Sequence, residues 1–206
     1  MTNVECCRGV CAKRLIDGFG ARRGERPYNA AFTLIELIVV TAVIIILTGL
    51  VLSTVGYVQK KGARARTETE IAALSAACES YKADNGIYPR DNTTNQYTDT
   101  LDARQNFDAT QAVYQHASFY LYTQLSGDNS GNRSPTGRSY MEFKPKMLLP
   151  PGGSGTVIAV SDPFGNSYGY STANQADPVT PKGYNPTFDL WSTANSTDPN
   201  QWIKNW

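Results

Sequence analysis

One uncharged stretch, Leu37–Val55, constrains this chain more than any other feature. Its nineteen residues are mostly Leu, Ile and Val, and none of them is Asp, Glu, Lys or Arg. A helix needs about 20 such residues to cross the ~30 Å of hydrocarbon in a bilayer, so the stretch predicts a transmembrane helix. A secretory signal peptide fits poorly, because the stretch is too long and because the small residues Ala30 and Ala31 precede it instead of following it.

The charges on the two sides of this stretch give conflicting signals about orientation. Residues 1–31 carry six basic and three acidic side chains, a net +3, whereas the whole chain is +1, so the remainder sums to −2. By the positive-inside rule, the leader stays in the cytoplasm and the C-terminal domain lies on the outer side of the membrane. Four basic residues after the stretch favour the opposite orientation: Lys60, Lys61, Arg64 and Arg66.

The charge balance and the scarcity of reactive side chains argue against two classes of function. A near-neutral domain lacks the clustered basic surface that nucleic-acid binding requires. His116 is the only histidine, and Cys78 is the only cysteine after residue 31. With so few groups, no pairing of a nucleophile with a general base is evident. We therefore expect neither a nucleic-acid partner nor an enzyme.

Glu36 is the residue that a simple membrane anchor does not explain. An acidic side chain at membrane depth costs about 3 kcal/mol unless it is paired, and the neighbours of Glu36 from Phe32 to Ile38 include no cation. A cut between Ala31 and Phe32 would create a cationic amine four residues upstream. The amine of a neighbouring copy would then pair with Glu36 when subunits stack. The alternative is a glutamate that snorkels to the membrane interface.

The segment Ala31–Glu36, AFTLIE, resembles the cleavage and assembly signal of type IV pilins and of type II secretion pseudopilins. The resemblance implies that a membrane prepilin peptidase cuts between Ala31 and Phe32 and methylates the new amino group of Phe32. It also implies that Glu36 guides assembly. Gly is the usual residue before the cut in this family, and Ala31 takes its place here.

Later segments are similar to the major, G-type pseudopilin of the type II secretion system: DNGIYP (84–89), DPFGNSYGY (162–170), FDLWS (188–192) and IKNW (203–206). This resemblance implies a structural subunit, stored in the bacterial inner membrane, that polymerises with further copies and with minor pseudopilins on an inner-membrane secretion platform. Such a periplasmic pseudopilus drives protein export across the outer membrane. The alternative is a type IV pilin for adhesion or DNA uptake, which the polar insert 91–139 would serve.

The resemblance also raises the question of a Ca²⁺ cofactor, because the C-terminal loop of G-type pseudopilins binds calcium. The equivalent loop here offers one carboxylate, Asp198, with Asn195 and Ser192 as neutral oxygen donors. Ca²⁺ usually takes six to eight oxygen ligands with more negative charge. The three residues are therefore a weak calcium candidate, and packing of the tryptophans alone is the alternative way to hold the loop.

We expect a pilin-like α+β fold in which a long N-terminal helix packs on a small antiparallel β-sheet. The residues Ile71, Leu74, Cys78 and Tyr81 repeat at helical spacing and predict a buried stripe. Asn85-Gly86 suits the end of that helix. Four regions are expected: a cleaved basic cytoplasmic leader at 1–31, the transmembrane part of the helix at 32–58, its amphipathic half at 59–86, and a periplasmic domain at 87–206.

Within the domain, turn residues and short apolar runs predict one helix and three strands. Asp108 is the expected N-cap of a helix that runs to Leu125, with Gly127 as its stop. The strands are expected at 157–160, 167–171 and 187–192. His116 on this helix is expected to be a surface or hydrogen-bonded side chain, and Cys78 a small core residue.

Overall fold

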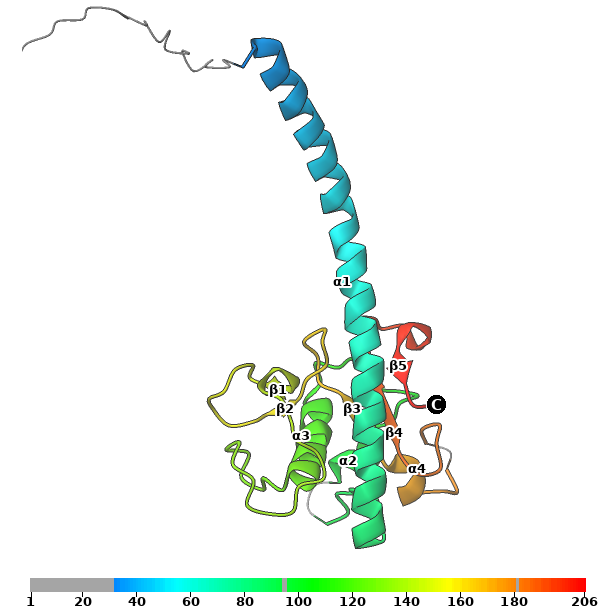
Figure 1. The fold of residues 1–206 in the computed structure, drawn as a ribbon. Helices are drawn as coiled ribbons and strands as arrows, with labels where there is room; N and C mark the ends of the chain where they lie inside the picture. Colours follow the sequence, from blue (N-terminus) through cyan, green and yellow to red (C-terminus); the bar gives the residue numbers. More distant parts are fainter. Residues whose placement is uncertain (1–31, 94–95, 181) are drawn as a thin grey trace, which may run out of the picture. The chain divides into compact units, whose positions relative to one another are not determined.

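The computed structural model describes residues 32–93, 96–180 and 182–206. The chain divides into two units, residues 1–48 and residues 49–206. In the described part, the first unit contains the beginning of helix α1 (Leu34–Asn85), and the second contains the remainder of α1 and every other element (Figure 1).

The other elements of the second unit are short, apart from α3. The helices are α2 (Tyr97–Thr100), α3 (Ala112–Ser126) and α4 (Ala173–Ala176), with 3-10 turns η1 (Pro145–Met147) and η2 (Pro199–Gln201). The strands are β1 (Leu148–Leu149), β2 (Ala159–Val160), β3 (Gly169–Ser171), β4 (Asp189–Ser192) and β5 (Ile203–Lys204).

Helix α1 ends where its sequence predicts. Gly86 adopts a left-handed conformation with φ 77°, and its N–H donates to the carbonyl oxygen of Lys82 at 2.7 Å. Glycine adopts this conformation without a Cβ penalty, which explains the stop after Asn85. Three of the four residues of the predicted stripe, Ile71, Leu74 and Cys78, are buried, and the fourth, Tyr81, is partly buried against the same core.

Helix α3 begins later than the sequence suggests, so the prediction of Asp108 as its N-cap is wrong. The carboxylate of Asp108 accepts hydrogen bonds from the backbone N–H of Thr110 (2.9 Å) and from its hydroxyl (2.7 Å). This local turn uses the acceptor that a cap would need, and Gln111 takes the N-cap position without a side-chain bond. The predicted stop is confirmed by Gly127, with φ 75°.

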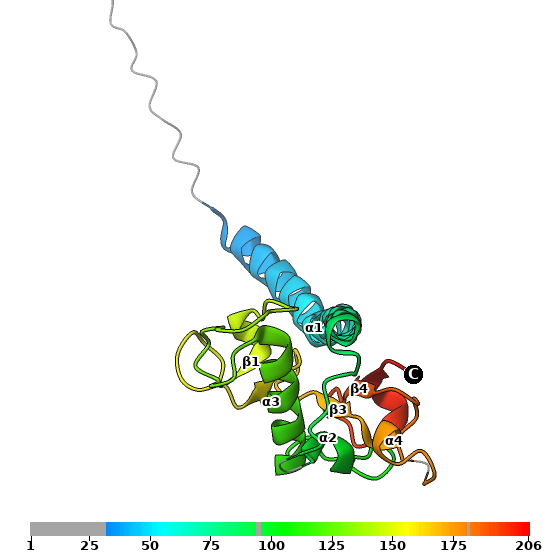
Figure 2. The ribbon, with the colours of Figure 1, turned by 90° about the horizontal axis from the view of Figure 1, so that it is seen from below.

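The strands form two antiparallel sheets, one of β1 and β2 and one in the order β3-β4-β5. In the larger sheet, Tyr170 pairs with Leu190 and Ser192 pairs with Ile203. In the second unit, α3 and this sheet lie side by side, and α1 runs across them on one face (Figures 1 and 2). The α+β, pilin-like arrangement expected from the sequence is therefore confirmed.

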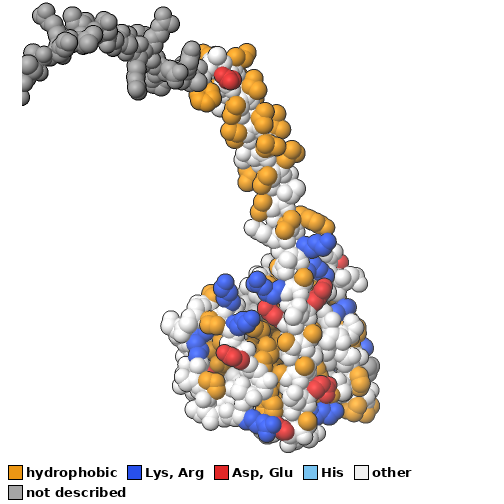
Figure 3. All heavy atoms as spheres, in the orientation of Figure 1, with side chains coloured by type: hydrophobic (Ala, Val, Ile, Leu, Met, Phe, Trp, Pro, Cys, Tyr) orange, Lys and Arg blue, Asp and Glu red, His pale blue; other side chains and the backbone are white. Residues whose placement is uncertain are grey.

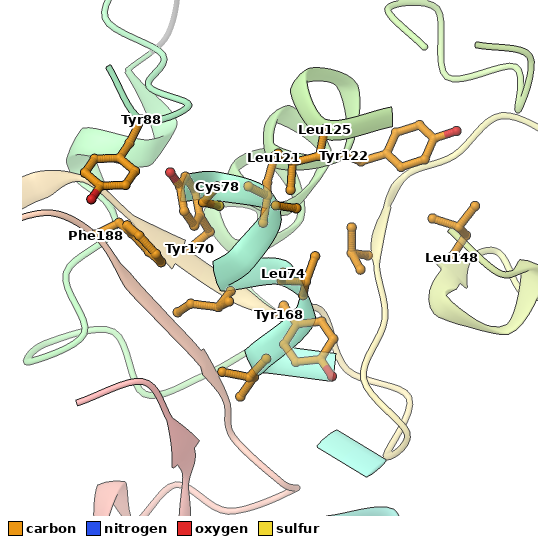
Figure 4. Packing of buried hydrophobic residues seen from close by; sticks show 14 of the residues in the cluster. Leu74, Cys78, Tyr88, Leu121, Tyr122, Leu125, Leu148, Tyr168, Tyr170 and Phe188 are labelled. Carbon is orange, nitrogen blue, oxygen red and sulfur yellow. The ribbon is translucent and has the colours of Figure 1, made fainter. Parts of the chain in front are cut away.

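The main core lies between α1, α3 and the three-stranded sheet. Leu74 and Cys78 of α1 pack with Leu121 of α3 and with Tyr168 and Tyr170 before and within β3 (Figure 4). Cys78 is fully buried, and burial raises the pKa of its thiol. It behaves as the small core residue that the sequence predicts rather than as a reactive thiol.

A second buried cluster is built around Trp191. Its ring stacks on Trp202, with 6.0 Å between ring centroids, and its indole N–H donates to the hydroxyl of Tyr114 at 3.1 Å. Gly169 faces this ring across the sheet, and a Cβ at Gly169 would lie only 2.2 Å from Trp191 Cε2. The close approach of the two strands therefore requires glycine at this position.

Candidate functional site

The start of α1 is closed by a reciprocal pair of side chains, Thr33 and Glu36. The backbone N–H of Glu36 donates to Thr33 Oγ1 at 3.3 Å, while Thr33 donates to Glu36 Oε2 from its backbone N–H (3.2 Å) and from its hydroxyl (3.0 Å). This is a capping box, in which each residue satisfies a backbone N–H that the helix leaves without a partner.

The capping box gives Glu36 a partner within its own chain, which the sequence argument missed by considering only cations and the membrane interface. The pattern T-x-x-E ahead of an apolar run was the readable signal. Thr33 carries no charge, however, so it does not supply a counter-ion for the carboxylate. Both bonds from Thr33 reach Oε2. In the described part of the chain, no hydrogen bond reaches Oε1, so that oxygen is free to accept one from another molecule.

The helix that follows is long and apolar enough to cross a membrane, judged by length and composition. Its large apolar side chains are exposed in the structure, as shown by the orange surface along the first part of α1 (Figure 3). Three of the four hydroxyls within the stretch donate back to helix carbonyls: Thr41 to Leu37 and Ile38, Ser53 to Leu50, and Thr54 to Val51. A helix with internally satisfied polar groups is the form that lipid tolerates.

The two residues of the expected cleavage site differ in what the structure describes. Phe32 is 84% exposed and precedes the helix, which begins at Leu34. Ala31 lies outside the described residues, as does the rest of the leader 1–31. Cleavage between Ala31 and Phe32 therefore remains a prediction.

The three calcium candidates each hold an oxygen that already has a protein partner. Ser192 is buried and donates its hydroxyl to the carboxylate of Asp162. Asn195 accepts a hydrogen bond from the amide of Asn166 at 2.6 Å. Asp198 caps η2 by accepting from the backbone N–H of Asn200 at 2.9 Å. In the described residues, no group of three or more His, Cys, Asp or Glu side chains converges. The candidates therefore do not fit a calcium site.

Calcium is accordingly expected to leave the melting temperature of the protein unchanged at millimolar concentration. A ligand at 100 times its Kd stabilises the folded state by about 2.7 kcal/mol, which a thermal melt detects easily. The measurement compares melts in calcium and in a chelator, for the native chain and for Asp198→Ala. A calcium-dependent rise that Asp198→Ala removes would reinstate the site.

Asp162 is a buried carboxylate that the sequence did not single out. Its Oδ1 accepts the backbone N–H groups of Phe164 (3.0 Å) and Asn166 (2.8 Å), and its Oδ2 accepts the hydroxyl of Ser192. The side chain thereby joins the turn before β3 to the end of β4. Burial raises the pKa of this carboxyl, and the hydrogen bonds from Ser192, Asn166 and Phe164 oppose that shift.

Asp162→Asn is expected to change how stability depends on pH. A carboxyl group whose pKa is raised in the folded state stabilises the fold when it is protonated. This contribution is fully present below the pKa of the unfolded chain, ordinarily about 3.9. It is lost as pH rises through the pKa of the folded state. The native chain should therefore lose stability relative to Asp162→Asn as pH rises. Urea unfolding of both proteins in detergent, from acidic to neutral pH, measures this difference.

A matched control is Asp108→Asn, because hydrogen bonds from Thr110 lower the pKa of that exposed carboxyl. A lowered pKa contributes stability that is present above the unfolded pKa and lost as pH falls. The native chain should therefore gain stability relative to Asp108→Asn as pH rises, the opposite slope. A stability difference between Asp162→Asn and the native chain that does not vary with pH would contradict the assignment.

One sequence pattern could be taken for catalytic machinery, namely G-x-S-x-G at Gly165–Gly169. In hydrolases this pattern places the serine on a sharp strand-to-helix turn. Here Ser167 is buried, pairs in an isolated bridge with Ser161, and leads into β3. His116, the only histidine, is exposed on α3 and stacks on Tyr97. Ser167 therefore does not lie on the strand-to-helix turn that this pattern marks in hydrolases.

Comparison with known proteins yields one match. The family model described as the Prokaryotic N-terminal methylation motif matches residues 26–52, which contain the capping box and most of the apolar stretch. No curated protein and no solved structure matches the chain. The chain thus carries a type IV pilin-like prepilin signal, which implies processing by prepilin peptidase and association with a membrane.

Proposed function

We propose that this protein is a structural subunit of a type II secretion pseudopilus. It is held in the bacterial inner membrane by a single span, with the domain in the periplasm, and it is cut by prepilin peptidase between Ala31 and Phe32. The methylation motif at 26–52 supports the processing and the membrane association in this proposal, and the resemblance of the later segments supports the pseudopilus role. The regions follow the proposed boundaries of leader 1–31, membrane span 32–58, amphipathic helix 59–86 and periplasmic domain 87–206.

In this proposal Glu36 sets the register between subunits. After cleavage, the methylated amine of Phe32 in one copy pairs with Glu36 of a neighbouring copy, which offsets the cost of a charge at membrane depth. The free Oε1 supports this role, because the bonds from Thr33 occupy only Oε2. The protein then polymerises with further copies and with minor pseudopilins, and it acts by assembly rather than by catalysis.

The resemblance of the later segments is the reason for preferring a pseudopilin to the alternative, a type IV pilin for adhesion or DNA uptake. Three segments that resemble G-type pseudopilins are separated in sequence, and in the structure they contribute β3, β4 and β5 of one sheet. The buried contact between Asp162 and Ser192 joins the first segment to the second. Deletion of the gene is therefore expected to leave secreted proteins inside the cell. Normal export with lost adhesion or DNA uptake would favour the pilin.

Processing is expected to give a mature chain that begins at N-methylated Phe32. The measurement is mass spectrometry of the N-terminal peptide of membrane-extracted protein, from cells with active prepilin peptidase and from cells with an inactivated one. Ala31→Gly should be processed at least as well as the native chain, and Ala31→Leu should block processing because the family places a small residue before the cut. An intact leader in peptidase-competent cells would refute the maturation step.

A further inference from the structure

Basic side chains in the second unit gather where α1 joins the domain (Figure 3). The two segments that meet there carry six Lys and Arg residues. Four come from one part of α1, and two come from the segment that leads into β1. We call them the basic collar: Lys60, Lys61, Arg64, Arg66, Lys144 and Lys146. The first four also give an orientation signal opposite to that of the leader, and the proposed function gives none of the six a role.

The two segments of the basic collar meet across a groove of about 500 Å³. Arg66 lies on one wall, and Lys144 and Lys146 lie on the other. Apolar atoms of Met141 and Met147 also line the groove. The fold therefore brings together cations that are almost 80 residues apart in sequence.

Most of these cations are available for a ligand. In the described part of the chain, none of the six lies within 4.0 Å of a carboxylate oxygen, and ion pairs occur elsewhere. Arg64 is partly used, because its guanidinium donates to the carbonyl oxygen of Gln201 at 2.8 Å. The other five are exposed.

The acidic side chains near the basic collar do not neutralise it. They are Glu68, Glu70, Glu142 and the buried Asp162, four against six cations. Glu70 is half-buried and accepts a hydrogen bond from the hydroxyl of Tyr168 at 2.8 Å, which fixes it toward the domain. The collar thus keeps a net positive charge that a ligand of opposite sign would complement.

The position of the collar on α1 indicates which ligand this is. The helix immediately before it is apolar and exposed, with Leu52 at 69% and Val58 at 64%. Val58 and Lys60 are two residues apart, about 3 Å along a helix axis. Cations that directly follow an apolar span lie at the level of the lipid headgroups, and Tyr57, 71% exposed, is an aromatic residue typical of that level.

We propose that the basic collar binds the phosphate groups of anionic phospholipids in the membrane that α1 enters. This inference rests on the membrane insertion in the proposed function, and it goes beyond it by assigning the domain itself a lipid-binding surface. Each Lys or Arg near an anionic surface contributes about 1 kcal/mol. The contacts of Lys144 and Lys146 would hold the domain against the membrane before assembly.

The test uses the full chain in nanodiscs of phosphatidylcholine, with and without phosphatidylglycerol. Hydrogen exchange of the backbone amides between Glu142 and Met147 is the readout. We expect exchange at least about fivefold slower in the anionic discs. The difference should disappear in about 1 M NaCl, where the Debye length is ~3 Å. Lys144→Gln/Lys146→Gln should abolish the slowing and leave the melting temperature unchanged, because both side chains are exposed.

The control variant Arg138→Gln/Lys182→Gln removes the same charge from other surfaces, and it should retain the slowing. Arg138 pairs with Asp84, 18 residues beyond Arg66 on α1.

Equal exchange in both lipids would overturn the inference alone, whereas failure of the chain to insert would overturn the proposed function as well. Slowing by inorganic phosphate in phosphatidylcholine discs would assign the groove to a free anion. Slowing that follows the number of copies per disc would assign it to a second copy. Either result would overturn the lipid assignment.

Discussion

Glu36→Gln is expected to abolish assembly while leaving membrane insertion and processing intact. Glutamine at this position still completes a capping box with Thr33, so the variant removes the charge and keeps the helix start. Without the ionic pair between copies, the ~3 kcal/mol that a paired charge gains at membrane depth is lost. This corresponds to a decrease in cross-linked oligomers of about 100-fold. Cross-linking in membranes, together with the N-terminal mass of the monomer, measures both effects.

Thr33→Val is the matched variant, because it removes the cap and keeps the charge. Loss of a threonine cap costs about 1 kcal/mol of helix stability, and assembly should remain within about twofold of the native level because the carboxylate still pairs. The opposite pattern, with Thr33→Val unable to assemble and Glu36→Gln normal, would show that Glu36 acts only as a cap. Glu36 would then have no role in register.

Gly169→Ala is expected to cause a large loss of stability. The new Cβ would lie 2.2 Å from Cε2 and 2.4 Å from Cζ2 of Trp191, a ring that is fully buried. Neither the ring nor the strand pair has room to move without disturbing the second cluster. Overpacking of this kind costs roughly 3 kcal/mol or more, a large fraction of the 5–15 kcal/mol by which domains are stable. Thermal melts should fall by roughly 6–12 °C.

Gly153→Ala supplies the control for this experiment. A Cβ at Gly153 meets nothing within 4 Å, so its effect should stay within about 0.5 kcal/mol. A melting temperature of Gly169→Ala equal to that of Gly153→Ala would mean that the sheet accommodates the methyl group. In that case the packing of Trp191 on β3 would be looser than the structure indicates.

The features that could be read from the sequence are those fixed by local chemistry. The ends of α1 and α3 were predictable because Gly86 and Gly127 serve as left-handed caps wherever they occur at a helix end. The start of α3 could not be predicted in this way, because the carboxylate of Asp108 can accept hydrogen bonds either as a helix cap or in a local turn. In the structure it accepts from Thr110 in a local turn. The capping role of Thr33 could have been predicted, since the T-x-x-E pattern lies within four residues.

The features that could not be read depend on contacts between distant segments. Strands β1 and β5 have two residues each, too few to show alternation. Asp162 meets Ser192 across 30 residues, and the sequence identified only the second of these. The groove between Arg66 and Lys144 arises in the same way. Its cations are visible in the sequence, but their proximity is a property of the fold.

The capping box at Thr33 and Glu36 also determines the conformation of the helix start before cleavage. Its hydrogen bonds involve neither Ala31 nor Phe32, so they can form in the uncut and in the cut chain alike. If the chain is cut between Ala31 and Phe32 as proposed, proteolysis need not remodel the first helical turn and only supplies a new ammonium group beside it. Under the proposed function, uncut monomers would already be folded at this end, and the peptidase would supply only the charge that assembly requires.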